Sequence, residues 1–465
     1  MAILLENIFH SKTLKKILPI LKLIDNETKE WGFVGGIPRD FLFYQKKLKT
    51  NELDIIFFHP IDKIFYFLIE KLNEYIKEKY FHPRFLTAKL VFEGFTPTLK
   101  NGLTIDLITA RNEYYPQPTS LPIIKPTQNI KEDLMRRDIT INSILLKRIP
   151  NYEEIAFEIV DPFGGYKDLI QKRIIVLHNE TFKEDPTRIY RIFRYKVRMN
   201  LEIEKETFEL IKNSKHFIKM LSINRVLNEL KRIFNEKKFD KVIEEFFKIG
   251  FDPINLEETN ENNLQKDLKI LRKSIISFEK FFDNQKVKFK TEFNKIDLIL
   301  SFLIANKFLK NPKYRNLISK DVQKLSSQWQ KFQEQFEQFK EKLKSKHIKR
   351  IFLENFCNEH FIKSKKIEPF VILLFFIFKY KALNLKFAIK KMIKRLFLID
   401  NKKITPNFIN SISIYYFDKN LDLETTKKII NTINRMFILN KVRTTKQIIR
   451  FAKKIIKREI LGNIE

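Results

Sequence analysis

The sequence predicts an α+β protein, in which a small N-terminal domain with a mixed β-sheet is followed by an elongated all-α remainder. Turn-forming residues are concentrated early, because seven of the nine glycines and twelve of the sixteen prolines precede residue 187. Short apolar runs typical of strands occur only before about residue 150. From about residue 183 onward, apolar residues recur at spacings of three and four, which indicates amphipathic helices.

The strands of the first domain are predicted from four short apolar runs. Within residues 31–58 the segments WGFVGG, RDFLFY and LDIIFF predict a strand, the start of a helix and a second strand. LVFEGF and LTIDLITA predict two further strands, with a turn at Lys100-Asn101-Gly102 between them. The first 26 residues carry apolar positions at helical spacing and are interpreted as a folded helix rather than a signal peptide.

The helical remainder is divided by prolines. RIYRIFRYKVRM, RVLNELKRIF and KVIEEFFKIGF are amphipathic, and breaks are predicted at Asp252-Pro253, near Asn311-Pro312, at Pro369 and at Pro406. No fixed-period repeat indicates a solenoid. The segment 363–398 combines Phe, Leu, Ile and Lys; we interpret it as a packed helix pair, with a membrane-surface helix as the alternative.

Composition and charge limit the class of protein. A chain of 465 residues is expected to form two to four domains. No apolar run of about 18 residues predicts a membrane span, so a cytoplasmic protein without a membrane partner is expected. Cys357 is the only cysteine, which excludes an intrachain disulfide and a thiolate zinc cluster. The net charge of +33 favours RNA or DNA as partner, although a base-biased genome could also produce a lysine-rich, solvated surface.

Three carboxylates and a double glycine form the first candidate site. Side chains alternate along a strand, so Glu52 and Asp54 share a face and could bind one divalent cation. Asp106 would add a third carboxylate if its strand is the neighbour, a set that suits two-metal nucleotidyl transfer. Gly35 and Gly36 at a strand-to-helix turn would let a triphosphate approach the backbone, with Arg39 adding charge at the helix start. A solvated acidic pair is the alternative.

The segment Glu184-Asp185-Pro186-Thr187-Arg188 is the candidate for base recognition. Proline at the start of a helix would fix that start, and Asp185 and Arg188 would then project from one face. A carboxylate that accepts from an exocyclic amino group and a guanidinium that donates to a ring nitrogen suit adenine and cytosine. The alternative is a structural Asp–Arg pair. Arg191 and Arg194 continue this face, toward phosphate or toward an acidic neighbouring helix.

Six motifs in order resemble a known family. VGGIPRD, LDIIFF, IDLITAR, DLMRRDITINSI, VDPFGGYKDL and EDPTRIYRIFRY are similar to the motifs of CCA-adding enzymes and bacterial poly(A) polymerases, within the nucleotidyltransferase superfamily. The resemblance covers residues 31–235, with a fainter match at SINRVLNELKRIF. It implies a catalytic head at 1–150, a base-recognising neck at 151–240, and a body and tail at 241–465 that bind RNA.

The resemblance also implies roles for individual residues. Gly36 and Arg39 match positions that hold nucleotide phosphates, and Glu52, Asp54 and Asp106 match the catalytic acidic positions that bind Mg²⁺. Arginines of the next motif would meet phosphate or ribose, and Asp138 would accept from a sugar hydroxyl. Asp185 and Arg188 match the positions that select ATP and CTP. The nucleotide-binding residues of that next motif are Arg136, Arg137, Asp138 and Asn142.

The expected activity is template-independent transfer of AMP, CMP or both from ATP and CTP to the 3′ end of tRNA. Poly(A) synthesis, or addition of only CC or only A, are the alternatives within the family. Outside it, the alternative is a catalytically weak RNA-binding relative, because Glu52 stands where the family has Asp. Pro38 replaces the usual Val, the stretch from Arg39 to Glu52 is about three residues longer than usual, and the residues between Arg111 and Arg136 match the family's flexible loop.

Overall fold

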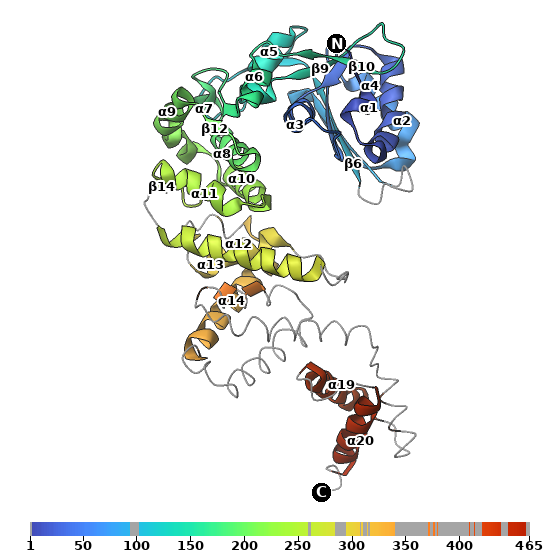
Figure 1. Ribbon diagram of the computed structural model, residues 1–465, viewed down its shortest axis with the longest axis vertical. Coiled ribbons are helices and arrows are strands. Elements are labelled where there is room, and N and C mark those ends of the chain that lie inside the picture. Colours follow the sequence, from blue (N-terminus) through green and yellow to red (C-terminus); the bar gives the residue numbers. More distant parts are fainter. Residues whose placement is uncertain are drawn as a thin grey trace. The chain divides into compact units, whose positions relative to one another are not determined.

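The computed structural model describes residues 2–93, 102–258, 262–283, 294–306, 308–309, 314, 317–339, 371–372, 375–376, 379, 409, 413, 421–438 and 445–461. The chain divides into two compact units, Met1–Thr259 and Asn260–Glu465, which are described separately (Figure 1).

The first unit is built on an eight-stranded mixed sheet with the order β1-β10-β9-β2-β3-β6-β5-β4. Its β3–β6 pair is parallel, and its other neighbouring strands are antiparallel. The sheet confirms the predicted α+β class. Its strands are β1 (Ile3–Leu4), β2 (Trp31–Phe33), β3 (Glu52–Phe57), β4 (Ile76–His82), β5 (Thr87–Phe92), β6 (Leu103–Thr109), β9 (Leu145–Arg148) and β10 (Ala156–Val160).

One face of the sheet carries the main core. Helices α1 (Leu5–Ile8), α2 (Ser11–Glu27) and α4 (Asp62–Leu72) lie beside the sheet in Figure 1 and bury their apolar stripes against it. Alternate residues of β3 and β6, such as Leu53 and Ile105, are buried in this core. A smaller apolar cluster, which includes Ile56, lies apart from it. The face opposite the main core therefore carries both this cluster and the acidic residues Asp54 and Asp106.

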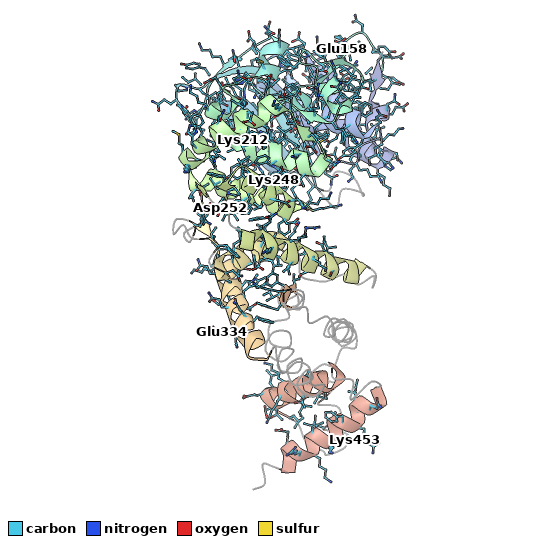
Figure 2. The ribbon with its side chains drawn as sticks, turned by 60° about the vertical axis from the view of Figure 1, so that its left-hand side comes forward. Glu158, Lys212, Lys248, Asp252, Glu334 and Lys453 are labelled. Atoms are coloured by element: carbon cyan, nitrogen blue, oxygen red, sulfur yellow. The ribbon has the colours of Figure 1, made fainter. Side chains whose placement is uncertain are left out.

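Helices follow the sheet within the first unit. In α8 the residues Tyr190 and Phe193 are fully buried, and both rings lie 4.7 Å from Phe246 of α11. Figure 2 labels Lys212 on α9, Lys248 at the end of α11, and Asp252 beyond it.

The remaining elements of the first unit are helices, 3₁₀ turns and short strands. The helices are α3 (Gly36–Tyr44), α5 (Ile130–Met135), α6 (Gly165–Ile170), α7 (Thr181–Glu184), α8 (Thr187–Met199), α9 (Lys205–Ser214), α10 (Ile223–Asn235) and α11 (Phe239–Lys248). The 3₁₀ turns are η1 (Asn73–Tyr75), η2 (Pro83–Phe85), η3 (Thr140–Asn142) and η4 (Lys215–Met220). The strands are the hairpin β7 (Arg111–Tyr114) and β8 (Ile123–Pro126), and β11 (Arg173–Ile174), β12 (Glu202–Ile203), β13 (Phe251–Asp252) and β14 (Glu257–Glu258).

The described part of the second unit is helical. Trp329 of α14 donates through Nε1 to Ser301 Oγ of α13 at 3.0 Å, and its ring lies 5.2 Å from Phe302. Isoleucines of α19 and α20 form a separate apolar cluster. No described helix of either unit is long and apolar enough to cross a bilayer. The helices are α12 (Asn262–Asp283), α13 (Lys295–Ala305), α14 (Lys320–Phe339), α19 (Leu423–Ile438) and α20 (Thr445–Leu461).

Several sequence predictions can be compared with these elements. The strand, helix and strand of residues 31–58 and the strand at LTIDLITA are confirmed, and the described part of LVFEGF belongs to β5. The chain near residue 252 is non-helical as predicted, because Asp252 accepts from Ile254 N and Asn255 N and forms a turn. The N-terminus forms a strand and two helices rather than one helix, and residues 112–135 hold a hairpin and α5 rather than only a loop.

Some predictions fall outside the described residues. They are the turn at Lys100-Asn101, the environment of Cys357, the breaks at Pro312, Pro369 and Pro406, and most of the packed helix pair at 363–398. The predicted boundaries at residues 150 and 240 stay predictions.

A buried ion pair fastens α2 to the sheet. Arg148 of β9 is 1% exposed and donates through Nε to Asp25 Oδ1 at 2.7 Å and through Nη2 to Oδ2 at 3.0 Å. Trp31 Nε1 and Lys29 Nζ also donate to this carboxylate. Burial raises the pKa of Asp25, but hydrogen bonds from Arg148 and Lys29 outweigh it and lower the pKa overall. The pair is therefore charged at neutral pH.

We expect Arg148→Met to lower the free energy of unfolding by about 3 to 5 kcal/mol, because it leaves a buried carboxylate without its main partner. Urea denaturation at pH 7 measures this. The matched control, Arg84→Met, removes an exposed arginine and should change stability by less than about 0.5 kcal/mol. A loss in Arg148→Met no larger than in the control would contradict the assigned role of the pair.

Candidate active site

Asp54 and Asp106 lie side by side on the two parallel strands. The register pairs Asp54 of β3 with Asp106 of β6, and Leu53 with Ile105. Because Leu53 and Ile105 are buried in the main core, the two carboxylates point to the opposite face of the sheet. The predicted adjacency of these strands is thus confirmed.

The electrostatics of this pair favour a bound cation. Burial raises the pKa of Asp54 to about 6, and the neighbouring Asp106 carboxylate adds to the rise. Burial likewise raises the pKa of Asp106, against the opposing effect of Lys89, whose Nζ lies 3.3 Å from Asp106 Oδ1. Lys89 was not foreseen from the sequence, since an exposed lysine on β5 carries no distinguishing pattern. The pair retains uncompensated negative charge that a divalent ion could neutralise.

Glu52 lines the same cavity as Asp54, and its charge contributes to the raised pKa of Asp54. It begins β3 and is exposed, two residues before Asp54 and therefore about 7 Å away along the strand. Among the residues that the structure describes, no three acidic, histidine or cysteine side chains are close enough together to hold a metal ion. Two carboxylates still fit Mg²⁺, which binds proteins through one or two carboxylates and completes its shell with water and substrate phosphate. The metal role of Glu52 stays a prediction.

The double glycine forms the turn between β2 and α3 next to the carboxylates. Gly35 has φ of +68°, a conformation that side-chain-bearing residues rarely adopt, and a Cβ there would lie 3.1 Å from Asp54 Oδ2. A Cβ on Gly36 would meet Arg39 Nη2 at 3.7 Å. The turn therefore keeps the backbone at Gly35 close to Asp54.

Arg39 is an internal connector of the site. It is 5% exposed, and its Nη1 donates to Asn142 Oδ1 at 2.8 Å. Its Nε donates to Asp40 Oδ1 at 2.8 Å, and its guanidinium lies 4.8 Å from the centre of the Tyr195 ring. Arg39 thus joins α3 to η3 and α8. Tyr195 was not foreseen, although its position four residues after Arg191 on the same helix was a usable signal.

The network continues through Asp138. This residue is 2% exposed; its Oδ1 accepts from Asn142 Nδ2 at 2.9 Å, and its Oδ2 lies 2.9 Å from Arg191 Nε. Burial raises the pKa of Asp138, but Arg191 and Asn142 overcome this and lower it overall. In this arrangement Asp138 positions Arg191, so its predicted bond to a ribose hydroxyl would require that pairing to change.

Asp133 binds the two arginines that follow it in the chain, Arg136 and Arg137. Arg136 Nη2 and Arg137 Nη2 each donate to its carboxylate at 2.8 Å. Burial raises the pKa of Asp133, yet the two arginines lower it to about 2. Arg137 also lowers the pKa of Asp54, so it lies within electrostatic reach of the carboxylate pair. Its Nε is buried without a hydrogen-bond partner among the described residues.

A cavity of about 1020 Å³ opens beside Asp54, large enough for a nucleotide. Six of its lining residues are cations and three are acids, so the cavity favours an anion. Arg194 Nε lies 3.2 Å from Glu236 Oε1. For Arg194 the structure thus shows the acidic neighbour that the sequence predicts as the alternative to phosphate. Most of the lining residues other than Glu52, Asp54, Arg191 and Arg194 were not predicted from the sequence. The lining is Tyr44, Glu52, Asp54, Arg191, Arg194, Tyr195, Val197, Arg198, Arg232, Asn235, Glu236, Lys237 and Lys238.

Asp185 and Arg188 lie at the start of α8 with separate partners. Asp185 Oδ1 accepts from Thr187 N at 3.0 Å, so it caps the helix, and from Arg225 Nη2 at 2.6 Å. Arg188 is 4% exposed; its Nη1 donates to Thr181 Oγ1 at 2.7 Å and its Nη2 to Arg136 O at 2.8 Å. Both side chains are rigidly held, and their role in base selection stays a prediction.

Comparisons with known proteins show which families this chain resembles. Residues 32–175 match the poly A polymerase head domain, and residues 200–260 match the domain described as "Probable RNA and SrmB- binding site of polymerase A". Over 164 residues the chain is 40% identical to an A-adding tRNA nucleotidyltransferase of Geobacter sulfurreducens, covering 35% of this chain and 17% of that protein.

Two further similarities extend the comparison. A CCA-adding enzyme of Streptococcus uberis is 30% identical over 228 residues, which cover 47% of this chain and 49% of that protein. The solved structure of a CCA-adding enzyme in its apo form II has the same fold, with a TM-score of 0.62 at 22% identity over 98% of this chain and 97% of that chain. The chain thus spans no more than half the length of either curated relative.

Proposed function

We propose that this protein is a Mg²⁺-dependent nucleotidyltransferase, because residues 32–175 match the poly A polymerase head domain and the chain is similar to an A-adding tRNA nucleotidyltransferase. It transfers AMP, CMP or both from ATP and CTP to the 3′ end of tRNA and releases pyrophosphate, without a nucleic-acid template.

One observation carries the proposal: the parallel pairing sets Asp54, which lines a cationic cavity, beside Asp106. In-line phosphoryl transfer needs little covalent chemistry from the protein, since catalysis rests on positioning and on neutralising charge. The carboxylate pair of Asp54 and Asp106, together with the arginines that line the cavity, meets both needs. The family relatives are named for this reaction on tRNA.

The cationic wall would bind the triphosphate. Arg191, Arg194 and Arg198 occur at spacings of three and four along α8, so they face the cavity together. Asp138 and Glu236 hold the arginines at their Nε atoms, which orients the guanidinium groups before a ligand arrives. Arg137, whose charge lowers the pKa of Asp54, would add positive charge near the site.

Asp54 and Asp106 would hold Mg²⁺. When bound, the ion would supply the positive charge that stabilises the attacking and leaving oxygens of the transfer. The protein's own contribution is to fix the two carboxylates by strand register and to keep the Gly35–Gly36 turn open beside Asp54.

Base selection is assigned to Asp185 and Arg188. Their rigid partners, Thr187, Arg225 and Thr181, limit the movement of both groups, and a preorganised acceptor and donor discriminate better than mobile ones. Adenine and cytosine each present an amino donor beside a ring-nitrogen acceptor, which match a carboxylate and a guanidinium.

The test uses the full chain with Mg²⁺ and tRNA transcripts that end before CCA, after the first C or after CC. CTP, ATP or both are supplied, and the products are separated at single-nucleotide length. Completion of CCA, or addition of only C or only A, supports the proposal and defines its range. Long A-tails on unrelated RNA would reassign the chain to poly(A) synthesis, and no product with retained tRNA binding would refute catalysis.

A further inference from the structure

A lysine-bearing segment separates α3 from β3. The segment QKKLKTN, residues 45–51, lies in the stretch that is about three residues longer than the family pattern. It is firmly anchored, because Leu48 N donates to Ile8 O at 2.7 Å and His10 N donates to Leu48 O at 2.9 Å. Leu48 is 9% exposed and belongs to the main core, whereas Lys46, Lys47 and Lys49 are exposed.

This segment and the start of α2 form a basic pocket of about 290 Å³. Its lining contains no carboxylate and consists of His10, Lys12, Thr13, Lys16, Lys49, Thr50 and Asn51. None of Lys12, Lys16 and Lys49 forms an ion pair with a described residue, although Lys16 Nζ donates to Asn51 Oδ1 at 3.5 Å. The arginines of the cavity, in contrast, are ion-paired. We call Lys12, Lys16, Lys46, Lys47 and Lys49 the lysine surface.

The lysine surface adjoins the cavity that holds Asp54. Thr50 of the pocket accepts at Oγ1 from Glu52 N at 3.0 Å, and Glu52 lines the cavity. At the other end of the segment, Tyr44 also lines the cavity, and Lys46 Nζ lies 5.0 Å from the centre of its ring. The unpaired lysines therefore continue from the rim of the cavity outward over the first unit.

We propose that the lysine surface binds the phosphates of the RNA strand whose 3′ end lies at Asp54, which rests on the proposed function. A strand that reaches the cavity across this rim meets several lysines in succession, and lysine is a point charge that suits phosphate contacts without base reading. A free triphosphate would need convergent donors around one position, whereas these lysines are spread over two segments.

The experiment measures binding of the full chain to a tRNA transcript ending in CC, without nucleotide, over 50 to 200 mM KCl. Lys46→Gln, Lys47→Gln and Lys49→Gln are combined in one variant. The matched control combines Lys63→Gln, Lys71→Gln and Lys79→Gln, exposed lysines of α4 and β4. The first variant should lower the slope of log affinity against log salt by about 2, since each phosphate contact on a single strand contributes about 0.7. Its Kd should rise about tenfold, and the control should match the unmodified chain.

The outcomes separate this inference from the proposed function. Unmodified protein that binds tRNA but adds no nucleotide would refute catalysis, and the binding comparison would still decide the role of the lysines. Equal slopes for both variants would overturn the inference. Two further results for the triple lysine variant would also overturn the inference. A raised KM for ATP with unchanged RNA binding would indicate a triphosphate site. Weaker binding to vesicles of anionic lipid with unchanged RNA binding would indicate a lipid-binding surface.

Discussion

Asp54→Asn is expected to lower the rate of nucleotide addition at least about a thousandfold while leaving tRNA affinity within about twofold. The variant keeps the shape of the side chain but removes half of the carboxylate pair on β3 and β6. Loss of several kcal/mol of transition-state stabilisation from a bound divalent ion corresponds to a decrease of this size. Single-turnover extension of tRNA ending in CC, at saturating ATP and Mg²⁺, measures the rate.

The same variant should be more stable than the unmodified chain at neutral pH. The pKa of Asp54 is raised from 3.8 to about 6 in the folded state, mainly by burial and then by Asp106. The folded state therefore holds this proton more tightly, so stability falls as pH rises between these two values. In EDTA at pH 7.5, Asp54→Asn should gain up to about 3 kcal/mol, and the gain should vanish below about pH 4.

Magnesium provides the control for this interpretation. Mg²⁺ should raise the melting temperature of the unmodified chain at pH 7.5 and have little effect on Asp54→Asn, because binding to the folded state alone is stabilising. Equal responses of the two proteins to Mg²⁺, or near-normal activity of the variant, would remove Asp54 from the metal site.

Asp185→Asn should weaken discrimination between ATP and the uridine and guanosine nucleotides by about 10- to 100-fold. An amide can still accept from Thr187 N and so retain the helix cap. It loses the negative charge and presents a donor where the base amino group needs an acceptor, and a paired contact of this kind contributes about 1 to 3 kcal/mol of discrimination. The ratio of kcat/KM values for the competing nucleotides measures the effect.

Arg225→Gln is the matched control, because it also breaks the ion pair between Arg225 and Asp185 but leaves the carboxylate in place. Discrimination should stay within about threefold of the unmodified chain, with any loss appearing as lower stability. If Arg225→Gln loses as much selectivity as Asp185→Asn, the carboxylate acts by holding the neck helices and not by reading the base.

The strands near the carboxylates were predictable because their apolar residues form patterns within a few consecutive positions. The alternation in LTIDLITA fixes which residues of β6 are buried, and side chains that alternate along both strands place Asp54 and Asp106 on one face. The turn at Gly35 and Gly36 was also predictable, because two adjacent glycines after a strand favour a turn. Gly35 adopts the positive φ that such a turn requires. Local sequence therefore predicts the centre of the site.

The partners of the charged residues were not predictable in the same way. Asp133 binds Arg136 and Arg137 within one helical turn, but Asp138 pairs with Arg191 and Arg39 with Asn142 across long stretches of chain. Such pairs depend on how helices pack against the sheet, which no local pattern specifies. Strands β4, β9 and β10 were missed because their residues lack a clear apolar alternation.

The pairing of β1 with β10 has a consequence for synthesis of the protein. Ile3 and Leu4 pair with Phe157 and Ala156, and β9 lies between β10 and β2. Roughly 150 residues must leave the ribosome before this half of the sheet can close, which takes ~10 to 30 s at ordinary translation speeds. During that time the apolar side chains of β2 lack their final neighbours, so the yield of folded protein should depend on translation rate and on chaperones that shield nascent chains.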